Sequence, residues 1–438
     1  MVAKQFEVEF SKDGSLFDEA QSSKVLDSLQ DLTDLVVISH GWNNDKSEAA
    51  KLYDAFVRSV DEVLSGGSVA QAAKRRYGVV RVFWPSKRFA DRDLIPGGGV
   101  ASAAPANESA LQRLLDELAI APEFLGGKDL APTRAAHLKR AKDLVSQLHE
   151  PAAQQGFVES IRAILDPSQK HADDGSTEFF STPAERLFSS LGAPVNFQVA
   201  AGGGGATGLG NGGAAGFFGD LLDGVTAAAR RIVNFATYYE MKTRAGTVGR
   251  GGLAQLLAAV RKRAPTLPIH LVGHSFGGRL VTAAASAFAP NSPAVTLTLL
   301  QAAFSHNGFG AKFDSEHDGA FRAVLSERRI SGPVLITHTK NDKAVGVAYP
   351  LASRIARDAA AALGDANDPY GGMGRNGAQK TPEADGLAGA LREVGGKYKF
   401  ERGKVYNLRA DQFIKDHMDV TGHQVAYALL QGATAVAE

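Results

Sequence analysis

One stretch of the chain combines residue types and a spacing that suit nucleophilic catalysis. Gly273-His274-Ser275-Phe276-Gly277 follows four residues typical of a buried strand, 269–272, and precedes a helix of small residues. Strand, G-x-S-x-G and helix in this order predict that Ser275 occupies a sharp, strained turn with its hydroxyl exposed above a sheet. The two glycines leave room where a side chain would collide with a neighbouring strand or helix. The alternative interpretation is a glycine-rich turn that holds a serine by accident.

A serine hydroxyl needs a base before it can act as a nucleophile at neutral pH, and the base needs an acid to orient it. Where a serine occupies such a turn, the acid follows at the end of a later strand and the histidine comes last in the chain. Asp342 fits the position of the acid, because it comes directly after the apolar segment 333–339. An ordinary Asn-Asp turn is the alternative for Asp342.

Two histidines are candidates for the base. Both His417 and His423 follow the last predicted strand, 404–410. Thr421 and Gln424 have the spacing of a capping box, which would place His423 in the first turn of the closing helix. His417 then lies in the preceding loop, where it is free to reach over the edge of the sheet. We therefore favour His417 and keep His423 as the alternative.

The elements that must position these residues alternate between strands and helices. Residues 5–10 alternate as an edge strand would, whereas Leu35 to Ile38 form a continuous apolar run. Such runs are typical of strands covered on both faces, so we predict a mostly parallel α/β sheet with helices on both faces. Further strands are predicted over 78–86, 294–304, 333–345 and 404–410, and helices over about 18–30, 47–64, 251–265, 348–363, 383–394 and 421–433.

The alternation stops between about 95 and 245, where helical spacing replaces it. The predicted helices of this region cover 107–120, 133–150, 155–165, 182–191 and 220–242. Ten of the twenty residues of 200–219 are glycine. Such a segment buries too little apolar area to offset its backbone entropy, so we predict a mobile hinge there. The sequence thus predicts a catalytic domain formed by 1–94 and 246–438, with a helical cap or lid inserted at 95–245.

Composition excludes several classes of function. A net charge of +1 gives no electrostatic case for nucleic-acid binding, and no apolar run is long enough to span a membrane. The alternating start lacks the apolar core of a signal peptide, so a cytoplasmic location is expected. The absence of cysteine rules out disulfides and thiolate chemistry.

No cofactor or metal is expected either. GLGNGG at 208–213 matches a dinucleotide-binding pattern, but no predicted strand precedes it. No His and Asp residues have the spacing of metal ligands.

Five segments resemble the serine-hydrolase branch of the α/β-hydrolase superfamily. They are DLVVISHGW, LVGHSFGG, THTKND and DHMDV, together with NFATYYEMKTRAGTVG, which resembles a segment of uncharacterised bacterial members. The resemblance covers about 35–90 and 235–435 and implies the α/β-hydrolase fold. Many relatives carry their cap after the strand that follows the nucleophile, whereas the insertion here precedes it. A substrate preference therefore cannot be transferred from a capped relative.

The resemblance also implies the roles of individual residues. Ser275 would be the nucleophile, Asp342 the acid and His417 the base. In lipases and esterases, an early strand that ends in His-Gly supplies an oxyanion donor through the next residue. His40-Gly41-Trp42 has this form, so the backbone N–H groups of Trp42 and Phe276 would stabilise the oxyanion. The alternative for His40-Gly41 is a strand that simply ends there.

These residues predict a hydrolase of carboxylic esters that works through an acyl-enzyme on Ser275. The expected substrate is a small ester with an apolar acyl part, because Phe217-Phe218 lies beside the glycine-rich segment and an apolar stripe follows over 220–236. Hydrolysis of amides or peptides, or acyl transfer, would use the same residues and stays open. A non-catalytic scaffold that binds a protein partner is a third hypothesis, against which a complete Ser, Asp and His set argues.

Overall fold

The computed structural model describes residues 2–86, 108–120, 132–192, 224–342, 344–345, 369–384 and 389–436. The chain divides into two compact units. The first comprises Met1–Ser86, Met241–Val345 and Gly372–Glu438, and the second comprises Lys87–Glu240 and Gly346–Gly371. The predicted helix over 348–363, the glycine-rich segment 200–219 and Phe217-Phe218 lie outside the described residues.

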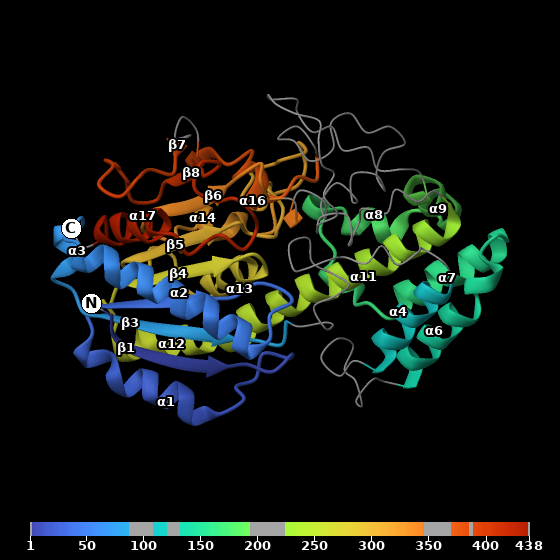
Figure 1. The fold of residues 1–438 in the computed structure, drawn as a ribbon, viewed down its shortest axis with the longest axis horizontal. Helices are drawn as coiled ribbons and strands as arrows, with labels where there is room; N and C mark the ends of the chain where they lie inside the picture. Colours follow the sequence, from blue (N-terminus) through green and yellow to red (C-terminus); the bar gives the residue numbers. More distant parts are fainter. Residues whose placement is uncertain are drawn as a thin grey trace, which may run out of the picture. The chain divides into compact units, whose positions relative to one another are not determined.

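An eight-stranded sheet, parallel throughout, forms the centre of the first unit (Figure 1). Its strands are β1 (Val2–Glu9), β2 (Asp34–Ser39), β3 (Tyr77–Phe83), β4 (Ile269–His274), β5 (Val295–Leu300), β6 (Val334–His338), β7 (Gly389–Ala390) and β8 (Val405–Arg409). Every residue of β2, β4 and β5 is buried, as the continuous apolar runs predicted. The predicted α/β class is confirmed, and β1 is the edge strand that its alternation indicated.

The direction in which the chain adds strands reverses in the middle of the sheet. The spatial order is β1-β3-β2-β4-β5-β6-β8-β7. After β2 the chain adds β3 on one side, and it then returns to add β4 and the later strands on the other side of β2. In open α/β sheets, ligands bind at the carboxyl ends of the strands where the order reverses. The topology therefore directs attention to the ends of β2 and β4.

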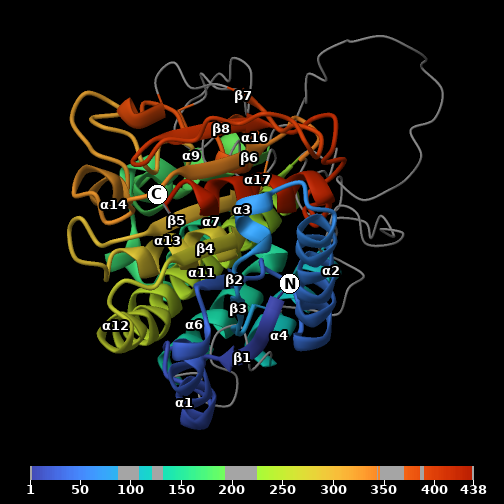
Figure 2. The same cartoon turned by 90° about the vertical axis from the view of Figure 1, so that its left-hand side faces the viewer.

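Helices cover both faces of the sheet (Figure 2). On one face, α17 (His423–Thr434) packs against α2 (Lys46–Ser65) and α3 (Ala70–Ala73). On the other face, α12 (Ala254–Arg263) packs against α1 (Glu19–Ser28) and α13 (Phe276–Ala285). The helices that follow β2 and β4 thus lie on opposite faces of the sheet.

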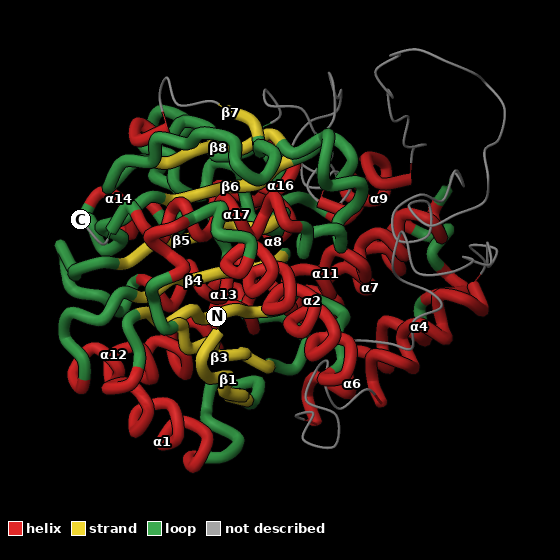
Figure 3. Tube along the Cα trace, turned by 60° about the vertical axis from the view of Figure 1, so that its left-hand side comes forward, coloured by secondary structure: helices red, strands yellow, loops and turns green. Residues whose placement is uncertain are grey.

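The described part of the second unit contains helices and loops but no strand (Figure 3). Its helices are α4 (Glu108–Ile120), α6 (Pro132–Asp143), α7 (Pro151–Ala163), α8 (Ser176–Ser181), α9 (Ala184–Gly192) and the first part of α11 (Val225–Val248). Phe157 packs against Phe188, and Phe179 packs against Phe235, with ring centroids 6.2 and 4.6 Å apart. The helical character predicted for this region is confirmed in these residues.

Two local predictions are wrong. The helix predicted over 383–394 is a 3-10 turn at Pro382–Ala384 and, further on, the short strand β7, because pairing with β8 overrides the local helical spacing. The capping box at Thr421 is not formed, since α17 begins at His423 with Gly422 as its N-cap. The carbonyl of Thr421 instead accepts a hydrogen bond from the Ser59 hydroxyl at 2.6 Å.

The remaining short elements join these helices and strands. They are the 3-10 turns Leu29–Asp31, Val145–Gln147, Pro167–Gln169 and Ala172–Asp174, the π-type turn Gly249–Leu253, and α14 (Arg322–Ser326) and α16 (Met373–Asn376). Among the helices that the structure describes, none has the length and apolar character required to cross a membrane.

Candidate active site

Ser275 occupies a strained turn between β4 and α13. Its backbone angles, φ 56° and ψ −125°, fall in a region that residues other than glycine rarely adopt and that costs about 1–3 kcal/mol. The Ser275 N–H donates to the carbonyl of Leu300 at 3.0 Å, and its carbonyl accepts from Gly278 and Ala303, both at 3.0 Å. Three hydrogen bonds therefore maintain the strained turn, and the residue is 5% exposed.

The glycines on either side of Ser275 are required by close approaches, as their positions predicted. A Cβ atom at Gly273 would lie 2.4 Å from the Cα of Gly278. A Cβ atom at Gly277 would lie 2.3 Å from the carbonyl oxygen of Ser39. Both distances are too short for any side chain, so Gly273 allows α13 to begin close to β4 and Gly277 allows α13 to pack against the end of β2.

The turn after β2 lies directly against Ser275. Strand register pairs Ser39 with Gly273, which brings the two segments that follow side by side. A Cβ atom at Gly41 would lie 2.6 Å from the Cβ of Ser275 and 3.2 Å from its hydroxyl oxygen. Gly41 is therefore the residue that lets the backbone of this turn reach the serine.

His40 shapes this turn without taking part in proton transfer. Burial lowers the pKa of His40 to about 4, so the ring is neutral at physiological pH. Its Nε2 accepts from the Trp84 N–H at 3.3 Å, so Nδ1 carries the proton and donates to the Gly41 carbonyl at 2.9 Å. The ring also stacks on Trp84, with centroids 5.6 Å apart. His40 is thus a structural residue that fixes the orientation of the Gly41 carbonyl.

The backbone N–H groups of Trp42 and Phe276 each belong to a peptide group whose carbonyl is already hydrogen-bonded. The amide of Asn44 donates to the carbonyls of Gly41 and Trp42 at 3.3 and 3.2 Å. In a trans peptide the N–H points opposite to the preceding C=O. The N–H of Trp42 is therefore directed away from His40 and Asn44, and the N–H of Phe276 is directed away from the partners of the Ser275 carbonyl. The rings of Trp42 and Phe276 lie 5.8 Å apart.

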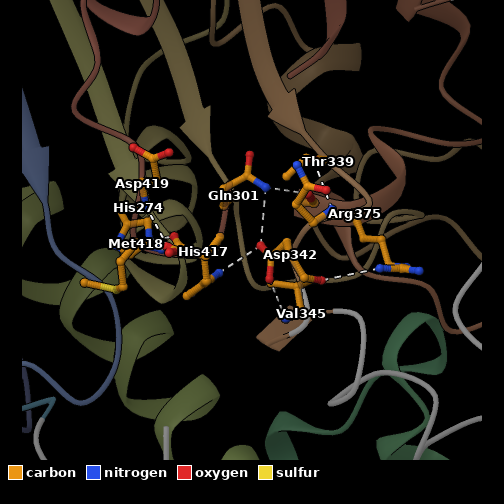
Figure 4. Close-up of polar contacts among 12 residues, drawn as sticks. His274, Gln301, Thr339, Asp342, Val345, Arg375, His417, Met418 and Asp419 are labelled. Carbon is orange, nitrogen blue, oxygen red and sulfur yellow. Dashed lines mark hydrogen bonds and ion pairs between the residues drawn. The ribbon is translucent and has the colours of Figure 1, made fainter. Parts of the chain in front are cut away.

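Asp342 and His417 form a buried pair at the ends of β6 and β8. His417 Nδ1 lies 2.8 Å from Asp342 Oδ2, and Asp342 is fully buried (Figure 4). Burial alone would lower the pKa of His417, but the charge of Asp342 and the hydrogen bond to it outweigh burial, so the pKa is raised. Asp342 Oδ1 also accepts from the N–H of Val345 at 2.9 Å. The pair has the geometry of a base that is oriented by an acid.

His423 lies elsewhere. Its Nε2 is 2.5 Å from Glu62 on α2, and both side chains are about half exposed. Of the two candidate bases, the structure brings His417 and not His423 to Asp342.

His274 links the loop of His417 to the segment of Ser275, and no role was predicted for this residue. Burial lowers the pKa of His274 to about 3, and the nearby ring of His417 adds to this effect. The ring is therefore neutral, and Nε2–H donates to the His417 carbonyl at 2.8 Å. The two imidazole rings are tilted, with centroids 4.8 Å apart. Because His274 precedes Ser275, this contact holds the loop of His417 beside the serine.

Gln301 and Asn341 hold Asp342 and its turn in place, and neither was predicted. Gln301 Nε2 donates to Asp342 Oδ2 at 3.3 Å and to the carbonyl of Gly374 at 2.8 Å (Figure 4). Asn341 Nδ2 donates to the carbonyls of Asp411 and Ile414 at 3.0 and 2.8 Å, which ties the turn after β6 to the loop that carries His417. Gln301 has a left-handed backbone conformation, with φ 46°. This conformation marks the residue as unusual in the structure, but it cannot be recognised in the sequence.

His274 links the segments of Ser275 and His417, and no hydrogen bond joins these two residues themselves in the described part of the chain. Within the described residues, neither the Ser275 hydroxyl nor Nε2 of His417 has a hydrogen-bond partner. Catalytic hydrogen bonds are often long before substrate binds, so this arrangement is compatible with a nucleophile and its base.

Comparison with known proteins identifies no relative. No family model matches the chain, and neither a curated protein nor a solved structure matches it. The described residues contain no group of three His, Cys, Asp or Glu side chains that could hold a metal ion. The chemistry of the site is therefore argued from its own geometry.

Proposed function

We propose that this protein is a serine hydrolase of the α/β-hydrolase type that cleaves carboxylic esters through an acyl-enzyme on Ser275. One observation carries the proposal: His274, which directly precedes a serine held on a strained turn, is hydrogen-bonded to the carbonyl of a histidine that is paired with a buried aspartate. The order along the chain supports it as well. The serine follows β4, the aspartate follows β6 and the histidine follows β8, which is the order of this class of enzyme.

In the proposed reaction, Ser275 Oγ attacks the carbonyl carbon of the ester while His417 Nε2 takes the hydroxyl proton. The imidazolium then returns this proton to the alkoxide that leaves, and an acyl-enzyme remains. Water, activated by the same histidine, attacks the acyl group and releases the acid and the free serine. Asp342 stays ionised throughout and stabilises the imidazolium, which is consistent with the raised pKa of His417.

The N–H groups of Trp42 and Phe276 are the proposed oxyanion donors. Their directions follow from the hydrogen bonds that engage the carbonyls of Gly41 and Ser275, and Gly41 lies in contact with the serine. Losing one donor of this kind typically costs about 2.7–4 kcal/mol of transition-state stabilisation. His40 and Asn44 would contribute indirectly, because they orient the peptide that carries the N–H of Trp42.

Reaction with a fluorophosphonate probe tests the proposal directly. We expect wild-type protein to be labelled covalently, Ser275→Ala to be unlabelled, and Ser286→Ala to be labelled like wild type, since Ser286 is an exposed serine at the end of α13. Matched ester and amide substrates of increasing acyl length then separate esterase from amidase activity. A protein that takes no label and turns over no ester would be the scaffold of the third hypothesis.

A further inference from the structure

A cavity lies at the opposite edge of the sheet from Ser275. It is a groove of about 710 Å³ at the amino ends of β6 and β8, where Val334 and Lys404 contribute to its lining. Small-molecule sites typically have volumes of about 300–1,000 Å³. None of the residues that line this groove belongs to the site around Ser275. The groove is therefore a separate place at which a ligand could bind.

The lining of the groove is strongly positive. It includes four cationic side chains, Arg322, Arg328, Arg402 and Lys404, and one carboxylate, Glu383. Arg322 donates to both oxygens of Glu383, at 2.6 and 2.7 Å. Burial opposes ionisation of Glu383, but the bonds from Arg322 and the charge of Lys404 lower its pKa, so it is ionised. Glu383 is therefore hydrogen-bonded to Arg322, and it interacts with Lys404 through its charge without forming a salt bridge.

The other three cations form no salt bridge in the part of the chain that the structure describes. Arg328, Arg402 and Lys404 are all exposed, and none of them forms a salt bridge with a described residue. Like charges gathered on one concave surface repel each other, and a bound anion relieves this repulsion. Two of the three are arginines, whose planar guanidinium groups match phosphate and carboxylate in bidentate geometry.

Hydrogen bonds between separate segments keep the walls of the groove in place. The N–H of Asn291 donates to the carbonyl of Arg328 at 3.0 Å, and the N–H of Gly403 donates to the carbonyl of Gly332 at 3.1 Å. Asn291 and Arg328 are both left-handed, with φ of 59° and 52°. Residues other than glycine adopt this conformation only where the surrounding structure requires it. The backbone segments that carry these cations are thus held in place before any ligand binds.

We propose that this groove binds a small organic polyanion, a molecule with two or more phosphate or carboxylate groups. Arg328, Arg402 and Lys404 bind the anionic groups, and Leu325, Ile330 and Val334 contact the organic part. The inference does not depend on the proposed hydrolase activity, because the groove shares no residue with the catalytic site. Binding is expected to persist in Ser275→Ala.

Isothermal titration calorimetry with the full chain tests this inference, with pyrophosphate and citrate as probes at low ionic strength. We expect saturable binding of one probe molecule per chain, weakened by added salt. In Arg402→Ala/Lys404→Ala the affinity should fall by roughly tenfold or more, since two charge-assisted contacts are removed. Lys51→Ala/Arg58→Ala is the matched control, because it removes the same two charges from exposed positions on α2, and it should bind within about twofold of wild type.

The two probes distinguish a phosphate site from a carboxylate site, since the one that binds more tightly identifies the preferred anion. A second variant, Arg402→Gln/Lys404→Gln, keeps polar side chains without their charge and should lose affinity to a similar extent, which guards against a folding defect in the alanine variant. The inference is overturned if neither probe binds saturably, or if the α2 control loses as much affinity as the groove variants. The latter result would mean that binding follows the overall charge of the protein.

Discussion

His417 and His270 each face a buried aspartate in the first unit, at nearly the same distance. Nδ1 of His417 lies 2.8 Å from Asp342, and Nε2 of His270 lies 3.0 Å from Asp34. Both carboxylates are fully buried. The histidines differ, because the side chain of His417 is 15% exposed whereas that of His270 is completely enclosed. The two pairs therefore show what separates a catalytic candidate from a structural contact of the same chemistry.

The two histidines differ in the contacts of the ring nitrogen that does not face the aspartate. His270 Nδ1 lies 2.9 Å from the Thr296 hydroxyl, and Asp34 also accepts from Arg75 Nε at 2.6 Å. This network links β2, β4 and β5 and uses both ring nitrogens inside the protein. Nε2 of His417 instead has no hydrogen-bond partner among the described residues and can accept a proton from outside the pair. An Asp-His pair can act as a base only when one nitrogen is left for the substrate's chemistry.

Asp342→Asn should give the largest effect on activity. The amide would favour the wrong tautomer of His417, so kcat/KM for an ester should fall by about 10⁴-fold. Val345 and Gln301 donate to different oxygens of Asp342, and the single amide oxygen can keep only one of these bonds, so the thermal midpoint should fall modestly. Steady-state kinetics and thermal unfolding on the same preparation check both expectations. A fall of less than about tenfold would remove Asp342 from the proposed catalytic set.

Asp34→Asn should have the complementary effect. Removing the charge that pairs with Arg75 and His270 leaves buried polar groups without their partner, and the free energy of unfolding should fall by about 3 kcal/mol. Activity of the folded protein should stay within about threefold of wild type, because this network lies away from Ser275. Urea denaturation and kinetics at low urea measure the two quantities. A large loss of activity without a loss of stability would reverse the roles assigned to the two pairs.

The two Asp-His pairs should also differ in how activity and stability depend on pH. The pKa of His417 is raised above its ordinary value of 6.5, so ester hydrolysis should rise with pH through this higher value, by about tenfold per unit on the acidic side. The contribution of His417 to the free energy of unfolding has the opposite pH dependence. This contribution is complete below pH 6.5 and is lost as pH rises through the pKa of His417 in the folded state.

Asp34 responds at lower pH. Burial opposes its ionisation, but the hydrogen bonds from His270 and Arg75 lower its pKa below 3.8. Its contribution to stability is present above pH 3.8 and is lost as pH falls through the folded pKa. Denaturation curves from pH 3 to 9 for wild type and Asp34→Asn should differ most above pH 4 and converge in acid. Curves that stay parallel down to pH 3 would show that Asp34 does not titrate with unfolding.

His274→Ala should give a smaller effect. The substitution removes the hydrogen bond to the His417 carbonyl, so the base is held less firmly and kcat/KM should fall by about tenfold. His274→Gln, which can offer an amide N–H to the same carbonyl, should recover part of the loss. The acidic limb of the pH profile should not move in either variant, because the His274 ring is neutral over the range in which His417 titrates. A shift of that limb would contradict a role limited to positioning the loop of His417.

The sequence predicted those parts of the site that depend on local chemistry. The strand–turn–helix around Ser275, the close approach at Gly273 and Gly277, and the position of Asp342 after a strand all follow from spacing along the chain. Gln301 could not be predicted in this way, because its contact with Asp342 depends on β5 lying beside β6. The contact between His274 and the loop of His417 joins residues 143 positions apart, and nothing in the sequence near either residue indicates it. Long-range pairing of strands, rather than local propensity, decides such contacts.

His423→Ala should give the smallest effect and thereby tests the choice between the two candidate bases. The side chain contacts Glu62 at an exposed position on α2, and no described contact joins it to Asp342 or Ser275. We therefore expect kcat/KM within about twofold of wild type and an unchanged pH profile, whereas His417→Ala should lose at least about 10³-fold. The comparison needs both variants in the same assay, with fluorophosphonate labelling as a second readout. If His423→Ala were the inactive variant, the base would reach the serine from α17, and the pairing of His417 with Asp342 would be a structural contact like that of His270 with Asp34.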